Sequence, residues 1–175
     1  MDLECYQRGL LDLLKERGIG CEDYLRGVAG TREIAVVREI AVWWRVFQLE
    51  AQCPFTARLL KRRGCFQELV ASHFNNNFTS PFVEELSRGF VLSLRFHDDP
   101  LIASVAQFEY AWLEVRDCSA RVFEVLWDRH PDLVFHALDN GSNLPEPETG
   151  CFYCMEVAQD VPGMIACKRH TYAPD

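Results

Sequence analysis

Four residues near the C-terminus have the types and the spacing of a structural zinc site. Cys151 and Cys154 form a Cys-x2-Cys pair, and twelve residues later Cys167 and His170 form a Cys-x2-His pair. Thiolate sulfur and imidazole nitrogen are ligands that Zn²⁺ prefers, and the two pairs supply the four ligands of a tetrahedral site. Neither pair has the glycine turn of a zinc knuckle. A zinc site is therefore one of two interpretations of this segment.

The second interpretation is a β-hairpin over residues 151–172. Asp160-Val161-Pro162-Gly163 is a favourable tight-turn sequence between two strand-like runs. A turn there sets Cys154 opposite Thr171, so Cys154 and Cys167 lie four residues apart along the ladder, about 13 Å, too far for a shared ion. The two interpretations exclude each other. The strand-like composition favours the hairpin, and we assign no metal ligand.

The rest of the chain carries no signature of a common catalytic class. The sequence holds no nucleophile elbow, Walker loop, dinucleotide-binding glycine pattern or helical histidine pair at zinc spacing. Its five histidines are scattered along the chain. We therefore assign no catalytic residue.

The distribution of charge disfavours general binding of nucleic acid. The net charge is -8, and the acidic excess lies after residue 64. One basic cluster, Arg58, Lys61, Arg62 and Arg63, stands just before Gly64. Cations in the last turn of a helix that ends at a glycine complement the helix dipole. An anion site is the alternative interpretation of this cluster.

The sequence also bears on compartment. No run of about 18 apolar residues occurs, and the N-terminus is acidic and amphipathic, unlike a signal peptide. The eight cysteines lack the spacing of a disulfide framework, so we expect reduced thiols. These features predict a cytoplasmic protein that does not associate with membranes.

The strongest predicted helix covers residues 100–116, with Asp99 as N-cap and proline at its first position. Large apolar residues recur along it at helical spacing and predict a core stripe: Leu101, Val105, Phe108, Trp112 and Val115. Glu109 interrupts a second apolar stripe beside it. Because buried charges are normally paired, we expect Glu109 to meet an arginine from a neighbouring helix.

The remaining segments complete an α+β prediction. Helices are expected from about residue 3 to 17, from 31 to 52, from 54 to 64 and from 65 to 73. A further helix is expected to start at Thr79-Ser80-Pro81 and to run to about residue 96. In the second of these helices, Val36, Ile40, Trp43 and Phe47 form an expected core stripe.

After Cys118 the sequence becomes strand-like. We predict short strands over 132–138, 151–158 and 164–172, while 121–127 extends a helix or forms a strand. The sequence thus predicts an N-terminal all-helical domain, residues 1–117, and a small C-terminal antiparallel β-sheet domain, residues 118–175.

The order of helix landmarks in residues 43–117 resembles the helical domain of the HvfC, MbnC and TglI group. In that group a proline-led helix ends in a leucine pair, an aromatic-led helix follows, and a proline-started helix leads to the pattern LA-x-x-A-x-x-E-x-A. The corresponding residues here are Pro54, Leu59, Leu60, Phe66, Pro81, Phe90, Ala106, Phe108, Glu109 and Ala111. By this resemblance, Glu109 is a family landmark that holds the helical domain together.

The resemblance also implies a function. Members of the group are small partner proteins of multinuclear non-haem-iron TIM-barrel enzymes, which modify cysteines in ribosomally made peptides. By resemblance, this chain is a non-catalytic subunit that forms a heterodimer with such an enzyme, binds the leader of a precursor peptide and presents its cysteine. The iron belongs to the partner enzyme, and this chain carries no cofactor. The short tail suits the MbnC or TglI type.

The predicted sheet suggests how a leader is held. A three-stranded sheet leaves an unpaired edge, to which an extended peptide can add as a strand. The first choice for that edge is the run that contains Leu133, Val134, Phe135, His136 and Leu138. The second is the strand at 165–169, whose Lys168 and Arg169 suit an acidic leader. Alternatively, these apolar residues simply pack on the helical domain.

Two other functions remain open from the sequence. A helical DNA-binding regulator would use the cluster at Arg58–Arg63, against a net charge of -8. A small zinc-binding protein would use the two cysteine-containing pairs that begin at Cys151 and at Cys167.

Overall fold

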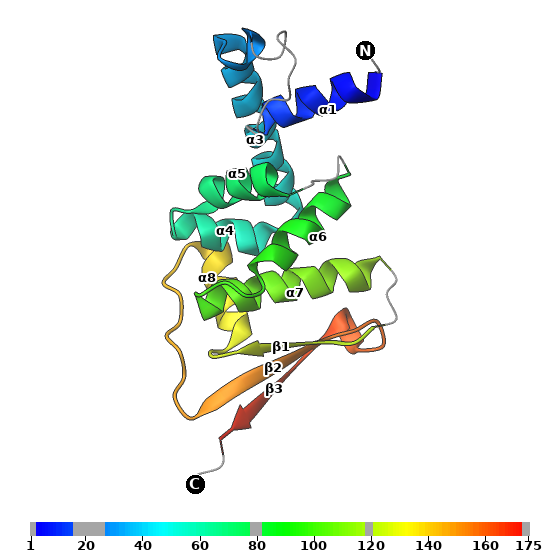
Figure 1. Ribbon diagram of the computed structural model, residues 1–175. Coiled ribbons are helices and arrows are strands. Elements are labelled where there is room, and N and C mark those ends of the chain that lie inside the picture. Colours follow the sequence, from blue (N-terminus) through cyan, green and yellow to red (C-terminus); the bar gives the residue numbers. More distant parts are fainter. Residues whose placement is uncertain (1–2, 16–26, 78–81, 118–120, 173–175) are drawn as a thin grey trace.

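The computed structural model describes residues 3–15, 27–77, 82–117 and 121–172. Helices come first along the chain, and a three-stranded sheet with one further helix follows (Figure 1). The predicted α+β fold is therefore confirmed. The elements are α1 (Leu3–Leu14), α3 (Arg32–Gln52), α4 (Pro54–Arg62), α5 (Phe66–Asn76), α6 (Val83–Leu94), α7 (Pro100–Arg116), β1 (Phe123–Trp127), α8 (Pro131–Asn140), β2 (Cys151–Val157), the 3-10 turn η1 (Pro162–Met164) and β3 (Ile165–Thr171).

Helix α7 lies between helices α3 to α6 and the sheet (Figure 1). Its start is as predicted, because the Asp99 carboxylate accepts a hydrogen bond from the Leu101 N–H at 3.0 Å. Leu101, Val105 and the rest of the predicted stripe are buried except Trp112, which is half-buried. Buried apolar residues from α3 to β2 form one cluster around α7, so the helical and sheet parts share one core.

The strands form one antiparallel sheet in the order β1-β2-β3. Residues 151–172 do form a hairpin, but Cys154 lies opposite Lys168 and not opposite Thr171 as predicted. The Met164 N–H bonds to the Val161 carbonyl at 2.8 Å, as a tight turn requires. The first ladder partner of Met164, however, is Ala158 and not Val161. The Ala158 N–H bonds to the Met164 carbonyl at 3.1 Å. Residues 159–161 loop out, and every later pair is shifted by three.

The strand predicted at 132–138 is wrong, because residues Pro131–Asn140 form helix α8. Pro131 occupies the first helical position, and Gly141 ends the helix in a left-handed conformation with φ of 79°. Both are standard helix boundaries. The buried residues recur at helical spacing, which the sequence analysis took for a strand-like apolar run: Pro131, Val134, Ala137 and Leu138.

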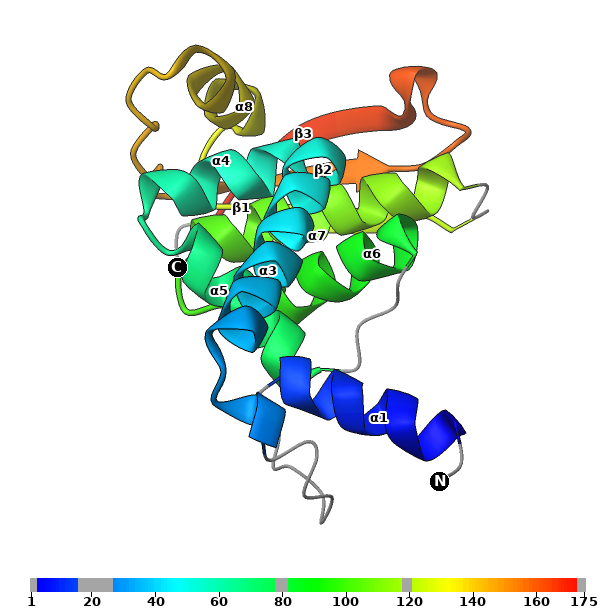
Figure 2. The same cartoon turned by 90° about the horizontal axis from the view of Figure 1, so that it is seen from above.

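The core stripe predicted for α3 is also wrong, although the helix itself is confirmed. α3 contacts α4, α5 and α6 through the face that carries the buried Val46 and Leu49. The predicted stripe lies on the opposite face and is exposed from Val36 to Phe47. Viewed from above, α3 crosses in front of α6 and α7, with α1 near its N-terminal half (Figure 2).

Candidate functional site

Glu109 is a buried carboxylate that caps another helix. Its Oε1 accepts a hydrogen bond from the Phe55 N–H at 2.7 Å, and its Oε2 accepts one from the Thr56 N–H at 3.0 Å. These amides belong to the first turn of α4, where N–H groups have no partner within the helix and the dipole is positive. The expected arginine partner is thus replaced by a helix N-terminus. Arg58 acts on the carboxylate only through its charge.

Burial dominates the titration of Glu109. Desolvation raises the pKa of this carboxyl to about 7, although the hydrogen bonds from Thr56 and Phe55 and the charge of Arg58 oppose the shift. Glu109 is only 4% exposed, and it does not line the pocket beside α3. Its role is therefore to join α7 to α4. Trp112, the other predicted structural residue, packs against the core and stacks on Phe108 with ring centroids 6.4 Å apart.

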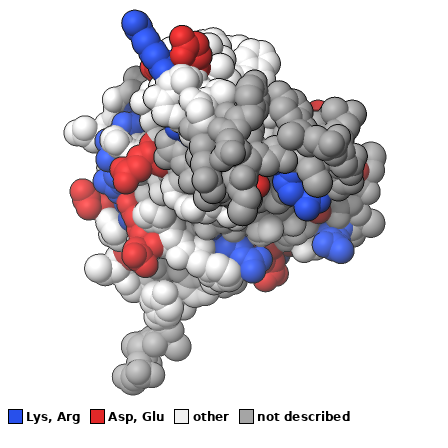
Figure 3. Space-filling view, turned by 45° about the horizontal axis from the view of Figure 1, so that its top comes forward, with Lys and Arg blue, Asp and Glu red and all other residues white. Residues whose placement is uncertain are grey.

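The basic cluster of α4 is used inside the fold. Arg58 pairs with Asp139 of α8, and Arg62 donates hydrogen bonds to the carbonyls of Ala137 and, at 2.7 Å, Ser142. Lys61 pairs with Glu50 at 2.7 Å, and Arg63 pairs with Asp99 at 3.0 Å. All four cations therefore join α4 to neighbouring segments. On the face shown in Figure 3, acidic and basic side chains are interspersed among the described residues.

The first-choice peptide edge does not exist as an edge. Leu133, Val134, Phe135, His136 and Leu138 all lie on α8, whose backbone groups bond within the helix. Val134 and Leu138 are buried, and Leu133 and His136 are exposed. Phe135 packs against Phe55 and Phe108, each with ring centroids 4.7 Å apart. The alternative in which these apolar residues pack on the helical part holds for Val134, Phe135 and Leu138.

The second-choice residues, Lys168 and Arg169, lie on β3, an edge strand. Within the described residues β3 pairs only with β2, and its residues from Cys167 to Thr171 are exposed on both faces. The Met164 carbonyl accepts a hydrogen bond from the Ala158 N–H, and the Tyr172 N–H donates one to the Gly150 carbonyl, so both bond to residues at the ends of β2. Because antiparallel ladders alternate, Ala166, Lys168 and His170 also direct their backbone groups to β2.

The same alternation defines the open edge of β3. Ile165, Cys167, Arg169 and Thr171 direct their N–H and C=O groups away from β2. The strand therefore presents a row of backbone donors and acceptors spaced for one more antiparallel strand. Neither α7 nor α8 is among the elements packed closely against β3.

Arg169 is held in place by a network that no pattern in the sequence indicates. The Glu148 carboxylate accepts hydrogen bonds from the Tyr153 hydroxyl at 2.7 Å, from Arg169 at 3.0 Å and from the Cys151 thiol at 3.2 Å. The Tyr153 bond, followed by the Cys151 bond, lowers the pKa of Glu148. Glu148 comes from a loop with two prolines, Pro145 and Pro147, and the hairpin register brings Arg169 to it. No spacing rule links these positions.

An aromatic platform lies on the outer face of the same hairpin. Phe152 stacks on His170 with ring centroids 4.9 Å apart and an interplanar angle of 12°. Tyr172 packs on Phe152 at 5.3 Å. Lys168 shares this face, because it lies two residues from His170 along the strand. Outer-face side chains of an added strand would therefore lie beside Lys168 and His170 of β3, with the ring of Phe152 stacked on His170 from β2.

The hairpin separates the four zinc-type residues. Cys151 and Cys154 are three residues apart on one strand, so their side chains point to opposite faces, and the same holds for Cys167 and His170. In the part of the chain that the structure describes, no group of three or more His, Cys, Asp or Glu side chains converges as metal ligands would. The five described cysteines are free thiols.

Among the described helices, none combines the length and the apolar character that crossing a bilayer requires. Comparison with protein-family models, curated proteins and solved structures finds no match to this chain.

Proposed function

We propose that this chain is a non-catalytic subunit that binds an extended, acidic leader of a ribosomally made precursor peptide along β3. It presents the cysteine of that precursor to an iron-dependent TIM-barrel enzyme, with which it forms a heterodimer. The observation that carries the proposal is the open edge of β3, which is exposed on both faces and bears Lys168, Arg169 and His170.

The backbone of β3 supports the peptide part of the proposal. An added strand would gain main-chain hydrogen bonds from the four outward-facing residues of β3, and this affinity does not depend on the peptide's sequence. Alternate side chains of the peptide would supply specificity. Those on the outer face would meet the Phe152–His170 stack and Lys168, and those on the inner face would meet Arg169. Both faces thus favour a peptide with carboxylates and aromatic or aliphatic side chains.

The enzyme part of the proposal is supported by the resemblance in residues 43–117. The proposal places iron only in the partner enzyme and gives this chain the task of positioning the substrate. It also places the complex in the cytoplasm, where free thiols such as Cys154 and Cys167 stay reduced.

The proposal is tested with a proline at an outward-facing position of β3. Cys167→Pro removes one backbone donor from the open edge but none from the ladder with β2. A fluorescent synthetic peptide, acidic and with aromatic or aliphatic side chains at alternate positions, would be titrated into the chain and followed by anisotropy. We expect Cys167→Pro to weaken binding by about tenfold or more, since it removes one hydrogen bond and adds a ring that blocks the approach.

Cys167→Ala is the matched control, because it removes the thiol and keeps the N–H. We expect it to bind as the unaltered chain does. Circular dichroism would verify that the proline variant keeps its fold. A folded Cys167→Pro variant with unchanged affinity would show that the leader is held elsewhere.

A further inference from the structure

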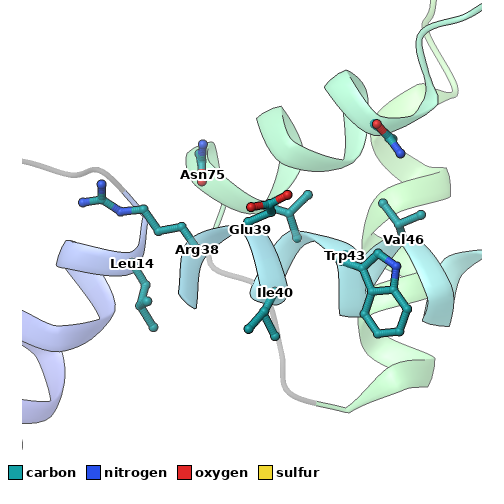
Figure 4. Close-up of a pocket in the computed structure, with 9 residues that line it drawn as sticks. Leu14, Arg38, Glu39, Ile40, Trp43, Val46 and Asn75 are labelled. Atoms are coloured by element: carbon teal, nitrogen blue, oxygen red, sulfur yellow. The ribbon is translucent and has the colours of Figure 1, made fainter. Parts of the chain in front are cut away.

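The outward face of α3 is an apolar surface without a cover among the described residues. Six large side chains on it are 44–60% exposed, and we call them the α3 face: Val36, Val37, Ile40, Trp43, Trp44 and Phe47. Ile40 and Trp43 project to the same side of the helix (Figure 4). The rings of Trp43 and Phe47 stack at 6.1 Å, and those of Trp44 and Phe47 at 5.6 Å.

The size of the α3 face indicates protein contact. Each of its six side chains exposes about half of its surface, so together they leave several hundred Å² of apolar surface. A patch of that size on a monomer usually marks an interaction site. With the surrounding side chains included, it approaches the roughly 800 Å² per partner of a standard interface.

The order of side chains along the α3 face makes it complementary to itself. Valine and isoleucine occupy the N-terminal half, and three aromatic rings occupy the C-terminal half. The stretch from Val36 to Phe47 is about 16 Å long. When a second α3 lies antiparallel with its centre between Ala41 and Val42, the rings of each copy meet the aliphatic side chains of the other. Val36 then faces Phe47, and Ile40 faces Trp43.

The charges beside the α3 face support the same arrangement. Arg32 and Glu50 are eighteen residues apart, which is five whole helical turns, so they lie along one edge of α3. Their midpoint is residue 41, beside the centre of the apolar face. The same antiparallel pairing therefore brings Arg32 of each copy to Glu50 of the other. Glu50 uses Oε1 to bind Lys61 at 2.7 Å, which leaves Oε2 for this contact.

A pocket beside the α3 face adds a place for a side chain from the second copy. It has a volume of about 500 Å³ and lies between the end of α1, α3 and α5. Ile40, Trp43 and Val46 line it from α3, and Gln67 and Asn75 line it from α5 (Figure 4). Such a pocket, apolar inside and polar at its rim, suits one bulky apolar side chain.

We propose that a second copy of this chain covers the α3 face, in a two-fold symmetric dimer built on antiparallel α3 helices. The interface is isologous, because the same residues serve both copies. This dimer is independent of the proposed binding of a peptide at β3. The sheet lies at the opposite end of the molecule from α1 (Figure 1), so both β3 edges stay open in the dimer.

Two charge reversals test the pairing by sedimentation velocity of the purified full chain. Arg32→Glu sets a new carboxylate against Glu50 at both symmetric contacts, and Glu50→Lys sets a new ammonium group against Arg32 at both. We expect each variant alone to raise the dimer Kd by about tenfold or more, by like-charge repulsion. When the two variants are mixed, each of the two contacts in the mixed dimer joins opposite charges. One contact joins the original Arg32 and Glu50, and the other joins the introduced glutamate and the introduced lysine. We therefore expect the mixed dimer to form.

Ile40→Glu tests the apolar centre, with Phe96→Glu as the matched control. Phe96 is 79% exposed but lies beyond α6, away from the α3 face. We expect Ile40→Glu to give a monomer and Phe96→Glu to remain a dimer. An unaltered chain that sediments as a monomer at about 100 μM would overturn the proposal. Two charge variants that do not associate on mixing would overturn the antiparallel pairing.

Discussion

Glu109 couples the stability of the fold to pH. Its pKa is about 7 in the folded chain and near the ordinary value of 4.5 when unfolded, so the folded state holds the proton more tightly. The contribution of this carboxyl to stability is fully present below pH 4.5 and is lost as pH rises through 7. The free energy of unfolding is therefore expected to fall by about 3 kcal/mol as the pH rises across that window. Urea unfolding at pH 5 and pH 8 measures the loss.

Glu109→Gln separates the charge of this side chain from its hydrogen bonds. Glutamine keeps one acceptor oxygen, but its NH₂ group faces a backbone N–H of Phe55 or Thr56. At pH 5 we expect a loss of about 1–3 kcal/mol, because one buried donor has no acceptor. At pH 8 the difference narrows, since glutamine does not ionise. A variant that keeps the pH dependence of the unaltered chain would show that another group titrates.

The sequence predicted at the residue scale that Glu109 is buried and partnered, but not who the partner is. Apolar neighbours at helical spacing on 100–116 place the carboxylate in the core. The partner is the backbone of α4, and backbone amides carry no signature in a sequence. The sequence analysis therefore expected an arginine, whereas Glu109 binds the Phe55 and Thr56 N–H groups that follow Pro54 in the first turn of α4.

Among the elements, α8 depends on its C-terminal glycine. Gly141 has φ of 79°, a conformation that costs an L-residue about 1–2 kcal/mol. We expect Gly141→Ala to lower stability by about 1 kcal/mol in urea unfolding. Gly30→Ala is the control, because an added Cβ there meets nothing within 4 Å and no left-handed φ is required. Equal losses in the two variants would contradict this account.

Two errors of the sequence analysis concern the type of one element, α8, and the buried face of another, α3. α8 carries helix boundaries at Pro131 and Gly141, but its apolar run was assigned to a strand by composition. For α3 the periodicity located the helix correctly, yet two stripes compete for the core. The larger side chains, including Trp43, lie outside, and the smaller Val46 and Leu49 lie inside. Periodicity finds an apolar stripe but does not say which partner buries it.

At the scale of the whole molecule, one core implies one unfolding transition. Trp127 of β1 is 1% exposed and packs edge-on against Phe135 of α8 at 5.4 Å. α7 joins that cluster to the helices. We expect far-UV circular dichroism, which reports mainly the helices, and near-UV signals to give the same midpoint in urea. Separate midpoints would show that the helical part and the sheet part are independent domains.

Part of the proposed peptide site could be predicted from the sequence, and part is visible only in the structure. Lys168 and Arg169 were found from the sequence because a strand with cations beside a turn is visible there. The Glu148 network depends on the three-residue shift in register, in which Arg169 lies opposite Tyr153 and the Ala158 N–H bonds to the Met164 carbonyl.

Cys167 makes occupancy of the β3 edge measurable without any label on a ligand. Its thiol is exposed on the edge strand, whereas Cys154 lies half-buried on the central strand and Cys53 and Cys151 are buried. Burial is the main cause that raises the pKa of both Cys154 and Cys167, so both react slowly with iodoacetamide. A strand seated on the edge would shield Cys167 and leave Cys154 as an internal reference. The ratio of the two carbamidomethyl mass shifts would then be a footprint of the bound state, readable in a crude mixture.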